Sequence, residues 1–145
     1  MKHVEQQEVM EEIKRLLKEK RIGILSTVRG DEPSTRYMIF RNEDLLLHTI
    51  SSRKSQKVQD ILINQKVHIL LGVDNGCYGK PYLDITASAT IHDEQEWKEH
   101  FWHDNFLKYL EGPDDPNYIV IRCEPKTIRL MNHPELDGPY TITFN

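Results

Sequence analysis

Residues 22–50, with the sequence IGILSTVRGDEPSTRYMIFRNEDLLLHTI, decide the fold of this chain. They contain three runs rich in β-branched and aromatic residues, at 22–28, 34–40 and 45–50. Two segments of turn-forming residues, 29–33 and 41–44, separate these runs. Short β-rich runs that alternate with turn signals are typical of strands joined by hairpins. We therefore expect an antiparallel meander here.

The patterns on either side of this meander predict three helices and further strands. Apolar residues recur at helical spacing at positions 9, 10, 13, 16 and 17, with acidic residues early and basic residues late, as suits a helix dipole. Downstream, in chain order, we expect a short helix at 55–64, a strand at 67–73, a strand at 82–91, an aromatic helix from Asp93 to about Leu110, and a strand pair at 118–123 and 126–131.

These expectations amount to about six strands and three helices in one domain that spans residues 1–145. Few of the elements alternate in strict βαβ order, so the sequence favours an α+β barrel over a doubly wound parallel sheet. A chain of 145 residues is long enough to bury a core without metal or disulfide bonds.

Composition narrows the possible partners. The net charge of −4 and the lack of a long basic stripe argue against nucleic-acid binding. The apolar stretches are too short to span a membrane and the charged N-terminus does not resemble a secretory signal, so we expect a cytoplasmic protein. The two cysteines, Cys77 and Cys123, form no CxxC motif and are expected to be reduced thiols.

The most informative candidate site is the stretch Ser51-Ser52-Arg53-Lys54-Ser55-Gln56-Lys57, which brings three cations and three hydroxyls to the start of a predicted helix. A helix N-terminus carries partial positive charge, so a basic cluster there is unfavourable by itself. A bound phosphate would reverse that balance, because helix amides, a Ser55 N-cap and the Lys57 charge could all contact it. A solvated basic loop is the alternative, and this stretch alone does not decide between the two.

Arg36 is the second candidate. In a strand at 34–40, Ser34, Arg36 and Met38 would share one face, while residues 35, 37 and 39 share the other. An arginine in the middle of a barrel strand would be costly if it were enclosed without a partner, and a bidentate phosphate contact would supply one. An arginine that faces solvent is the alternative reading.

The order of these segments resembles a known family. The chain is similar to the pyridoxamine 5'-phosphate oxidase-like FMN-binding split barrels, and in particular to the small general stress proteins among them. The residues that carry the resemblance are Arg36-Tyr37-Met38, Leu45 to Thr49, Ser55 to Ile61 and Asn64 to Val67. The resemblance implies an antiparallel six-stranded split β-barrel of Greek-key type with flanking helices.

The resemblance also implies a cofactor site and an assembly. Arg36, Ser55 and Lys57 would hold the phosphate of FMN, with Arg53 and Lys54 as an alternative register, and the residues beside the ring or ribityl chain would be Tyr37, Met38, His48 and Thr49. The protein would be a homodimer with FMN at the interface. No catalytic residue is assigned. No metal site is assigned either, because His92, His100 and His103 complete no ligand motif.

The implied function is that of an FMN-dependent oxidoreductase acting with a small-molecule electron donor or acceptor. Vitamin B6 oxidation is not expected, because Met131 of Arg129-Leu130-Met131 stands where the true oxidases have a histidine. Two alternatives remain open, a stress-linked flavin-binding module without turnover and a split barrel that binds another cofactor.

Overall fold

The computed structural model describes residues 6–72, 79–135 and 138–144. Its elements are α1 (Gln6–Glu19), β1 (Ile22–Arg29), β2 (Glu32–Ile39), β3 (Arg41–Glu43), β4 (Leu46–Ser52), α2 (Gln56–Ile63), β5 (Lys66–Leu71), β6 (Tyr82–His92), α3 (Gln95–Phe101), the 3₁₀ helix η2 (Asp104–Lys108), β7 (Tyr118–Met131) and β8 (Tyr140–Thr143). None of the described helices is both long and apolar enough to cross a bilayer.

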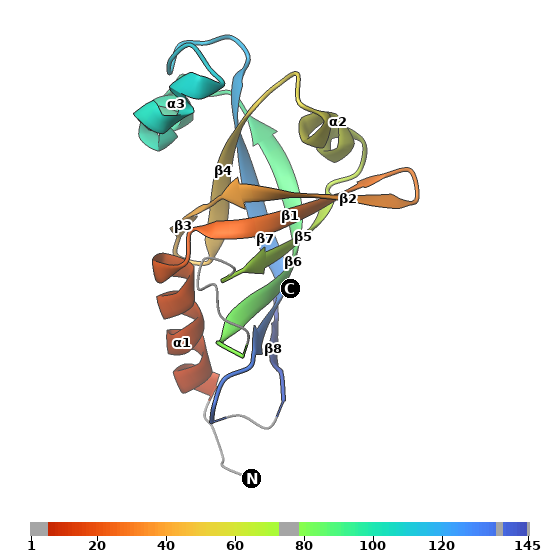
Figure 1. Ribbon diagram of the computed structural model, residues 1–145, viewed down its shortest axis with the longest axis vertical. Coiled ribbons are helices and arrows are strands. Elements are labelled where there is room, and N and C mark those ends of the chain that lie inside the picture. Colours follow the sequence, from red (N-terminus) through yellow and green to blue (C-terminus); the bar gives the residue numbers. More distant parts are fainter. Residues whose placement is uncertain (1–5, 73–78, 136–137, 145) are drawn as a thin grey trace.

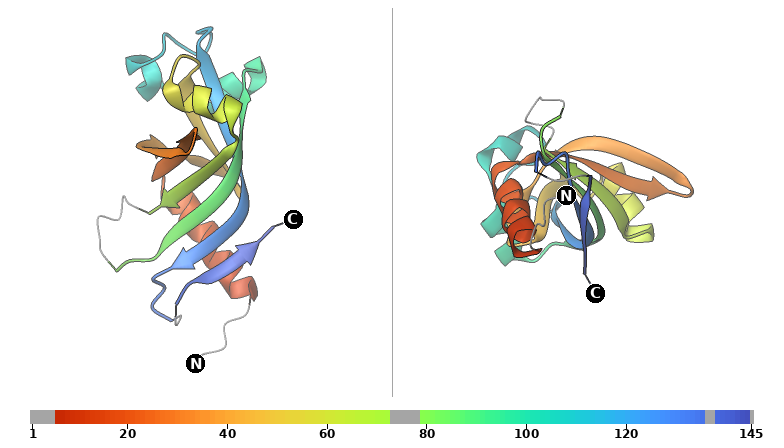
Figure 2. Two further views of the ribbon diagram at one scale, coloured as in Figure 1. Left: turned by 90° about the vertical axis from the view of Figure 1, so that its right-hand side faces the viewer. Right: turned by 90° about the horizontal axis from the view of Figure 1, so that it is seen from below.

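One eight-stranded antiparallel sheet forms the body of the molecule. The strand order is β2-β1-β5-β6-β7-β4-β3, and β8 pairs with the C-terminal part of β7, at residues 127–130. The sheet curls around a core, with α1 along one end and α2 and α3 at the other (Figures 1 and 2). The expected α+β class and antiparallel barrel are therefore confirmed, although the described residues contain eight strands where six were expected.

The meander expected from residues 22–50 is correct only in its first half. β1 and β2 form a hairpin through the two-residue turn Gly30-Asp31. Residues 41–44, expected as a turn, instead form β3 and a second tight turn in which Asp44 adopts a φ of 52°. That turn sends β4 back along β3, and β4 pairs on its other side with β7 rather than with β2.

As a result, β2 lies at one edge of the sheet and β4 lies across the barrel opening from it. The Thr49 hydroxyl of β4 donates a hydrogen bond of 2.8 Å to the Ile39 carbonyl of β2. This contact joins two strands that are not neighbours in the sheet, and it brings the residues of both to one place.

Two expectations for the C-terminal half were wrong. Residues 118–131 form the single strand β7 rather than a hairpin, because β6 pairs with residues 120–131 of β7. The register shifts once, between Thr86 and Ala87 of β6, where the pairing skips Lys126 of β7. The aromatic helix ends at Phe101, and Trp102 and His103 are extended before η2 begins. The His103 side chain accepts a hydrogen bond of 3.1 Å from the Asn105 amide and so caps η2.

Candidate functional site

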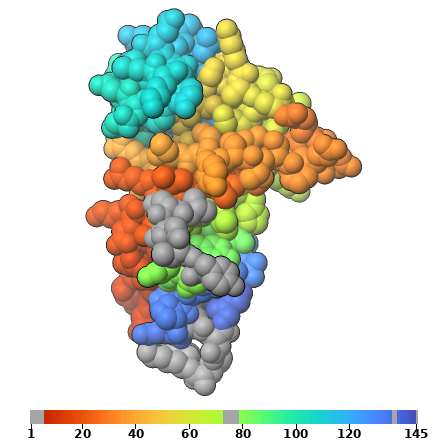
Figure 3. Space-filling view, in the orientation of Figure 1, coloured from red at the N-terminus to blue at the C-terminus, as the bar shows by residue number. Residues whose placement is uncertain are grey.

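A pocket of about 560 Å³ opens between β2, β4, the start of α2 and the segment after α3. In Figure 3, the orange part of the chain that contains β2 lies below two other segments. These are the teal segment of α3 and η2 and the yellow segment of α2. Six of the seven residues that the sequence suggested line this pocket, namely Arg36, Tyr37, Met38, Thr49, Ser55 and Lys57. The remaining lining residues are Ile22, Ile39, Ile50, Ser51, Ser52, Phe106, Tyr109 and Leu110.

Hydroxyls and an amine meet at the end of the pocket formed by α2. The Lys57 ammonium donates to the Ser51 hydroxyl at 3.0 Å, and the Ser51 and Ser55 hydroxyls lie 2.9 Å apart. Ser55 occupies the N-cap position of α2, but its side chain makes no capping bond. It donates instead to the Ser52 carbonyl at 2.7 Å. The expected Ser55 cap is therefore absent, and no side chain among the described residues accepts a hydrogen bond from the first amides of α2.

Arg36 reaches the same pocket from β2. Ser34, Arg36 and Met38 share the inner, half-buried face of this strand, as the alternation predicted. The guanidinium donates to the Thr27 hydroxyl at 2.8 Å and to the Ser34 hydroxyl at 2.9 Å. Only 21% of the Arg36 side chain is exposed, so the charge is held close to the pocket wall rather than in solvent.

Burial and like charge disfavour the charged forms of these two cations. Burial lowers the pKa of Lys57, and the charge of Arg36 lowers it further. Burial also lowers the pKa of Arg36, the nearby Arg29 adds to that effect, and Asp60 opposes it. Desolvation and like charge are the two causes that weaken the charged form of a base. An anion in the pocket would relieve both, so the arrangement is suited to bind a negatively charged group.

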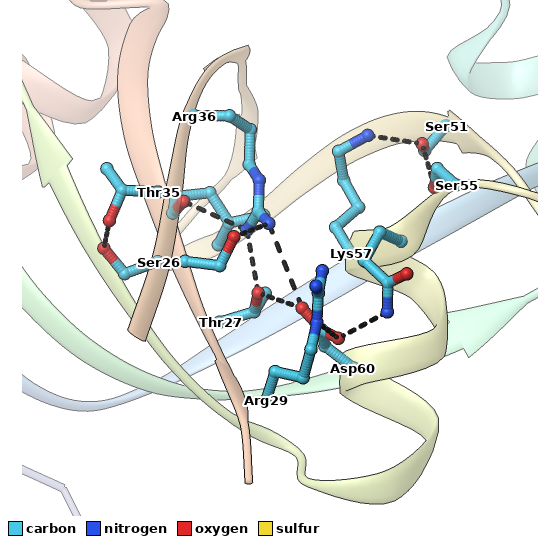
Figure 4. A network of polar contacts seen from close by, with 12 residues as sticks. Ser26, Thr27, Arg29, Thr35, Arg36, Ser51, Ser55, Lys57 and Asp60 are labelled. Carbon is cyan, nitrogen blue, oxygen red and sulfur yellow. Dashed lines mark hydrogen bonds and ion pairs between the residues drawn. The ribbon is translucent and has the colours of Figure 1, made fainter. Parts of the chain in front are cut away.

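Asp60 supports this cluster from behind and was not anticipated. Its carboxylate is 1% exposed and accepts hydrogen bonds from the Thr27 hydroxyl at 2.8 Å, the Gln56 amide at 2.9 Å and Arg29 Nε at 3.3 Å (Figure 4). Burial raises the pKa of Asp60, but these three bonds together outweigh burial and hold the pKa below its usual range. A fourth contact, to Arg36 Nη2 at 3.9 Å, links the carboxylate to the pocket.

A sequence signal for Asp60 does exist. It lies between Val58 and Ile61, both of which face the core, so a helix pattern places a carboxylate at a buried position. A buried carboxylate requires donors. Those donors come from β1 and from α2 itself, and the β1 donors are remote in sequence.

The other end of the pocket is apolar and open. Ile22, Tyr37, Ile39 and Tyr109 line it, and the side chains of Tyr37 and Tyr109 are 73% and 80% exposed. This end of the pocket therefore leaves aromatic and aliphatic side chains in contact with solvent.

Arg53 and Lys54 do not line the pocket. Arg53 is exposed and pairs with Asp93 at 3.0 Å. Between the two registers considered for the phosphate, the geometry brings only Ser55 and Lys57 together with Arg36.

His48 is the one suggested residue that the structure places elsewhere. It lies on the opposite face of β4 from Thr49, 1% exposed, and stacks on Phe101 with ring centroids 4.4 Å apart. Burial lowers its pKa to about 4, and the nearby Arg122 charge adds to this effect. Arg122 Nε donates to His48 Nε2 at 3.0 Å, so the neutral ring carries its proton on Nδ1.

No cluster of three or more potential metal ligands occurs among the described residues. His92 stacks on Trp97 at 4.0 Å and hydrogen-bonds with Thr90, while His100 lies 3.5 Å from Glu43. Cys77 lies outside the described residues, and Cys123 is buried in the core.

Comparison with known proteins places the chain in a family. Residues 9–132 match the model of the pyridoxamine 5'-phosphate oxidase family. General stress protein 26 of Bacillus subtilis (strain 168) is 35% identical over 130 residues, which cover 90% of this chain and 93% of that protein. The crystal structure of general stress protein 26 from Bacillus anthracis str. Sterne is 32% identical, with a TM-score of 0.82, and the match covers 94% of this chain and 98% of that one.

A more distant structure shares the fold alone. The Clostridium acetobutylicum protein related to general stress protein 26 is 19% identical, with a TM-score of 0.77 over 97% of both chains. The family match, the two close relatives and the curled antiparallel sheet agree, and the chain belongs to the pyridoxamine 5'-phosphate oxidase family, with the split-barrel fold of its small general stress proteins.

Proposed function

We propose that the pocket between β2, β4 and α2 binds FMN, with the phosphate against Arg36, Ser51, Ser55 and Lys57. The observation that carries this proposal is the pair of partly buried cations, Arg36 and Lys57, which line one pocket. The charge of Arg36 also lowers the pKa of Lys57. A dianionic phosphate would accept hydrogen bonds from both, and from the first amides of α2.

The remainder of the pocket fits the rest of this cofactor. A volume of about 560 Å³ lies within the range of pockets that hold ligands of this size. Met38, Tyr37 and Thr49 lie beyond the cations along β2 and β4, where a ribityl chain and a flat ring would extend. His48 is not part of the proposed site, because it faces α3.

We further propose that the protein is a homodimer with the flavin at the interface. The exposed side chains of Tyr37, Ile39 and Tyr109 at the open end of the pocket support this proposal. A second copy of the chain would cover them together with the cofactor, and closed two-fold pairing is the commonest way in which soluble proteins assemble. Light scattering on the FMN-loaded protein tests the assembly, and a monomer with the cofactor fully bound would contradict it.

The activity we propose is that of a flavin-dependent oxidoreductase. FMN when bound supplies the hydride or electron transfer. The chain's own residues bind the phosphate, orient the ring and keep water from it. We assign no acid or base, and vitamin B6 oxidation is not proposed because Met131 replaces the expected histidine.

The decisive binding experiment compares FMN with riboflavin, which lacks the phosphate. We expect Lys57→Met to weaken FMN binding by about 10- to 150-fold, the equivalent of one hydrogen bond to a charged group, and to leave riboflavin binding unchanged. Lys54→Met is the matched control, because Lys54 is exposed and lies three residues away, outside the pocket. Equal losses for FMN and riboflavin, or a larger loss from Lys54→Met, would contradict the phosphate assignment.

Turnover is tested separately from binding. Anaerobic mixing of the FMN-loaded protein with NADH or NADPH should bleach the flavin absorbance. A protein that binds FMN but is bleached by neither donor would instead be a flavin-binding module, which is the second function that the family resemblance left open.

A further inference from the structure

A second pocket adjoins the first and plays no part in the function proposed above. It has a volume of about 710 Å³ and lies between the end of α1, β3, β4 and the segment from Phe101 to Phe106. The two pockets share part of their walls, namely Ile22, Ile39, Thr49, Ile50 and Phe106. A ligand in the second pocket would therefore lie beside whatever occupies the first.

The wall of this second pocket is cationic. Lys18, Arg21 and Arg41 contribute three positive charges, and Glu19 is the one acidic residue of the lining. The Glu19 carboxylate is already bonded to Arg15 at 2.7 Å. Within the described residues, the side chains of Lys18 and Arg21 make no hydrogen bond or ion pair. The wall thus carries three basic side chains and one acidic side chain, so its net charge is positive.

The two arginines are held near each other by the backbone. The Phe40 amide donates to the Arg21 carbonyl at 2.6 Å, which ties the residue before β1 to the residue next to Arg41. One guanidinium nitrogen of Arg41 donates to the His100 carbonyl at 3.1 Å, and to the other described residues the guanidinium makes no further hydrogen bond. A planar guanidinium with free donors is suited to bind a carboxylate through two parallel hydrogen bonds.

The rest of the wall is aromatic. Phe101, Trp102 and Phe106 line the side formed by α3 and η2. Arg41 lies over the Phe101 ring at 5.6 Å, so the cationic and aromatic parts meet directly. His48 also lines this pocket, but as a neutral ring it adds no charge near pH 7. Cations beside flat apolar surfaces match a flat organic anion better than an inorganic one.

We infer that the second pocket binds an aromatic carboxylate, with the carboxylate on Arg21 and Arg41 and the ring against Phe101, Trp102 and Phe106. The assignment of this ligand as the substrate rests on the proposed function, because only a flavin in the first pocket would make the neighbouring ligand a redox partner. The binding itself depends only on the residues of the second pocket.

The test uses 2-naphthoate and its neutral analogue naphthalene-2-carboxamide, titrated calorimetrically into the whole protein with and without FMN. We expect 2-naphthoate to bind and the carboxamide to bind at least about 10-fold more weakly, since one charge-assisted contact is worth about that factor or more. Arg21→Gln and Arg41→Gln should each weaken 2-naphthoate by about 10- to 150-fold, by the same arithmetic, and leave FMN affinity unchanged. Arg53→Gln is the matched control, because that arginine is exposed and lines neither pocket.

The outcomes separate this inference from the proposed function. If 2-naphthoate binds no better than the carboxamide, or is indifferent to both arginine changes, the inference is wrong. Arginine-dependent binding without FMN, in a protein that fails to bind FMN, would support the carboxylate site and refute the flavin. In the FMN-loaded protein, 2-naphthoate should also shift the flavin absorbance bands, and unchanged bands during saturation would refute the placement beside the ring.

Discussion

Replacing Asp60 with asparagine should both destabilise the protein and weaken the candidate cofactor site. The change keeps the shape of the side chain but removes the buried negative charge. It also replaces one of the two acceptor oxygens with an NH₂ group, which is a donor. The three groups that now donate to the carboxylate belong to Thr27, Arg29 and Gln56.

The contacts set the size of the effect. The bond to the fully buried Thr27 hydroxyl is charge-assisted and contributes about 1.5–3 kcal/mol. The Arg29 side chain is 57% exposed, so its pairing adds at most about 1 kcal/mol. Gln56 adds a similar amount, and the asparagine oxygen keeps one of the three bonds. The sum is a loss of about 2–4 kcal/mol, which for a domain of this size lowers the melting temperature by roughly 5–15 °C.

The effect should depend on pH in one direction. The pKa of Asp60 is held below its usual range in the folded protein, so the unfolded chain takes up the proton first as the pH falls. The carboxylate therefore contributes its full stability above about pH 5 and loses it below about pH 4, as the pH falls through the depressed folded value. Urea titrations of both proteins should give a constant stability gap from pH 8 to pH 5 and a smaller gap near pH 4 and below.

Asp44→Asn provides the matched control. Asp44 pairs with Lys14 at 3.2 Å, and its side chain is 72% exposed. Asparagine tolerates the positive φ of this position, so the change should cost less than about 0.5 kcal/mol. The reasoning about Asp60 is refuted if its variant melts within 1–2 °C of the parent (that is, about 0.5 kcal/mol), or if the stability gap is unchanged at the lowest pH at which both proteins still fold.

Three further predictions concern the core. Ile61→Ala removes a side chain that is 1% exposed and should cost about 2–5 kcal/mol in urea unfolding, whereas Leu62→Ala, at a position 62% exposed, should cost about 0.5 kcal/mol or less. Tyr118→Phe deletes the hydroxyl that donates to the Lys98 carbonyl at 2.7 Å, and thermal melting should show a loss of about 1–3 kcal/mol because the carbonyl is left unsatisfied. Burial raises the pKa of Cys123 to about 12, so in a Cys77→Ser background this thiol should react with a disulfide reagent only when the protein unfolds; rapid labelling of the native protein would show that β7 opens locally.

The elements that local pattern determines were predictable. The helical spacing of apolar residues located α1 and α2 to within a few residues, and β1 and β2 follow from a strand-turn-strand pattern around Gly30. The alternation that put Ser34, Arg36 and Met38 on one face also held, because strand geometry fixes it.

The elements that depend on remote partners were not predictable from pattern alone. Arg41–Glu43 was expected as a turn and forms a strand because β4 returns beside it. The turn expected between 123 and 126 is part of a continuous strand, because β6 pairs on both sides of it with a register shift that skips Lys126. The same limit applies to the site. The residues suggested on β2 and α2, and Thr49 on β4, line one pocket, whereas His48 lies on the opposite face of β4 from that pocket. Asp60 was not suggested, because its contacts with Thr27 and Arg29 are remote in sequence.

The position of β2 at the edge of the sheet has a consequence for solubility. In the described chain, one side of this strand has no neighbouring strand, so its free amides and carbonyls could recruit a strand of another molecule. Two features of β2 discourage such edge-to-edge pairing. Pro33 has no amide hydrogen, and the charge of Arg36 points inward. The charge of Arg36 would then reduce aggregation whether or not an anion is bound. An Arg36→Leu chain should accordingly precipitate at lower concentration than the parent even in the absence of any cofactor, whereas Lys57→Met, on a helix, should not.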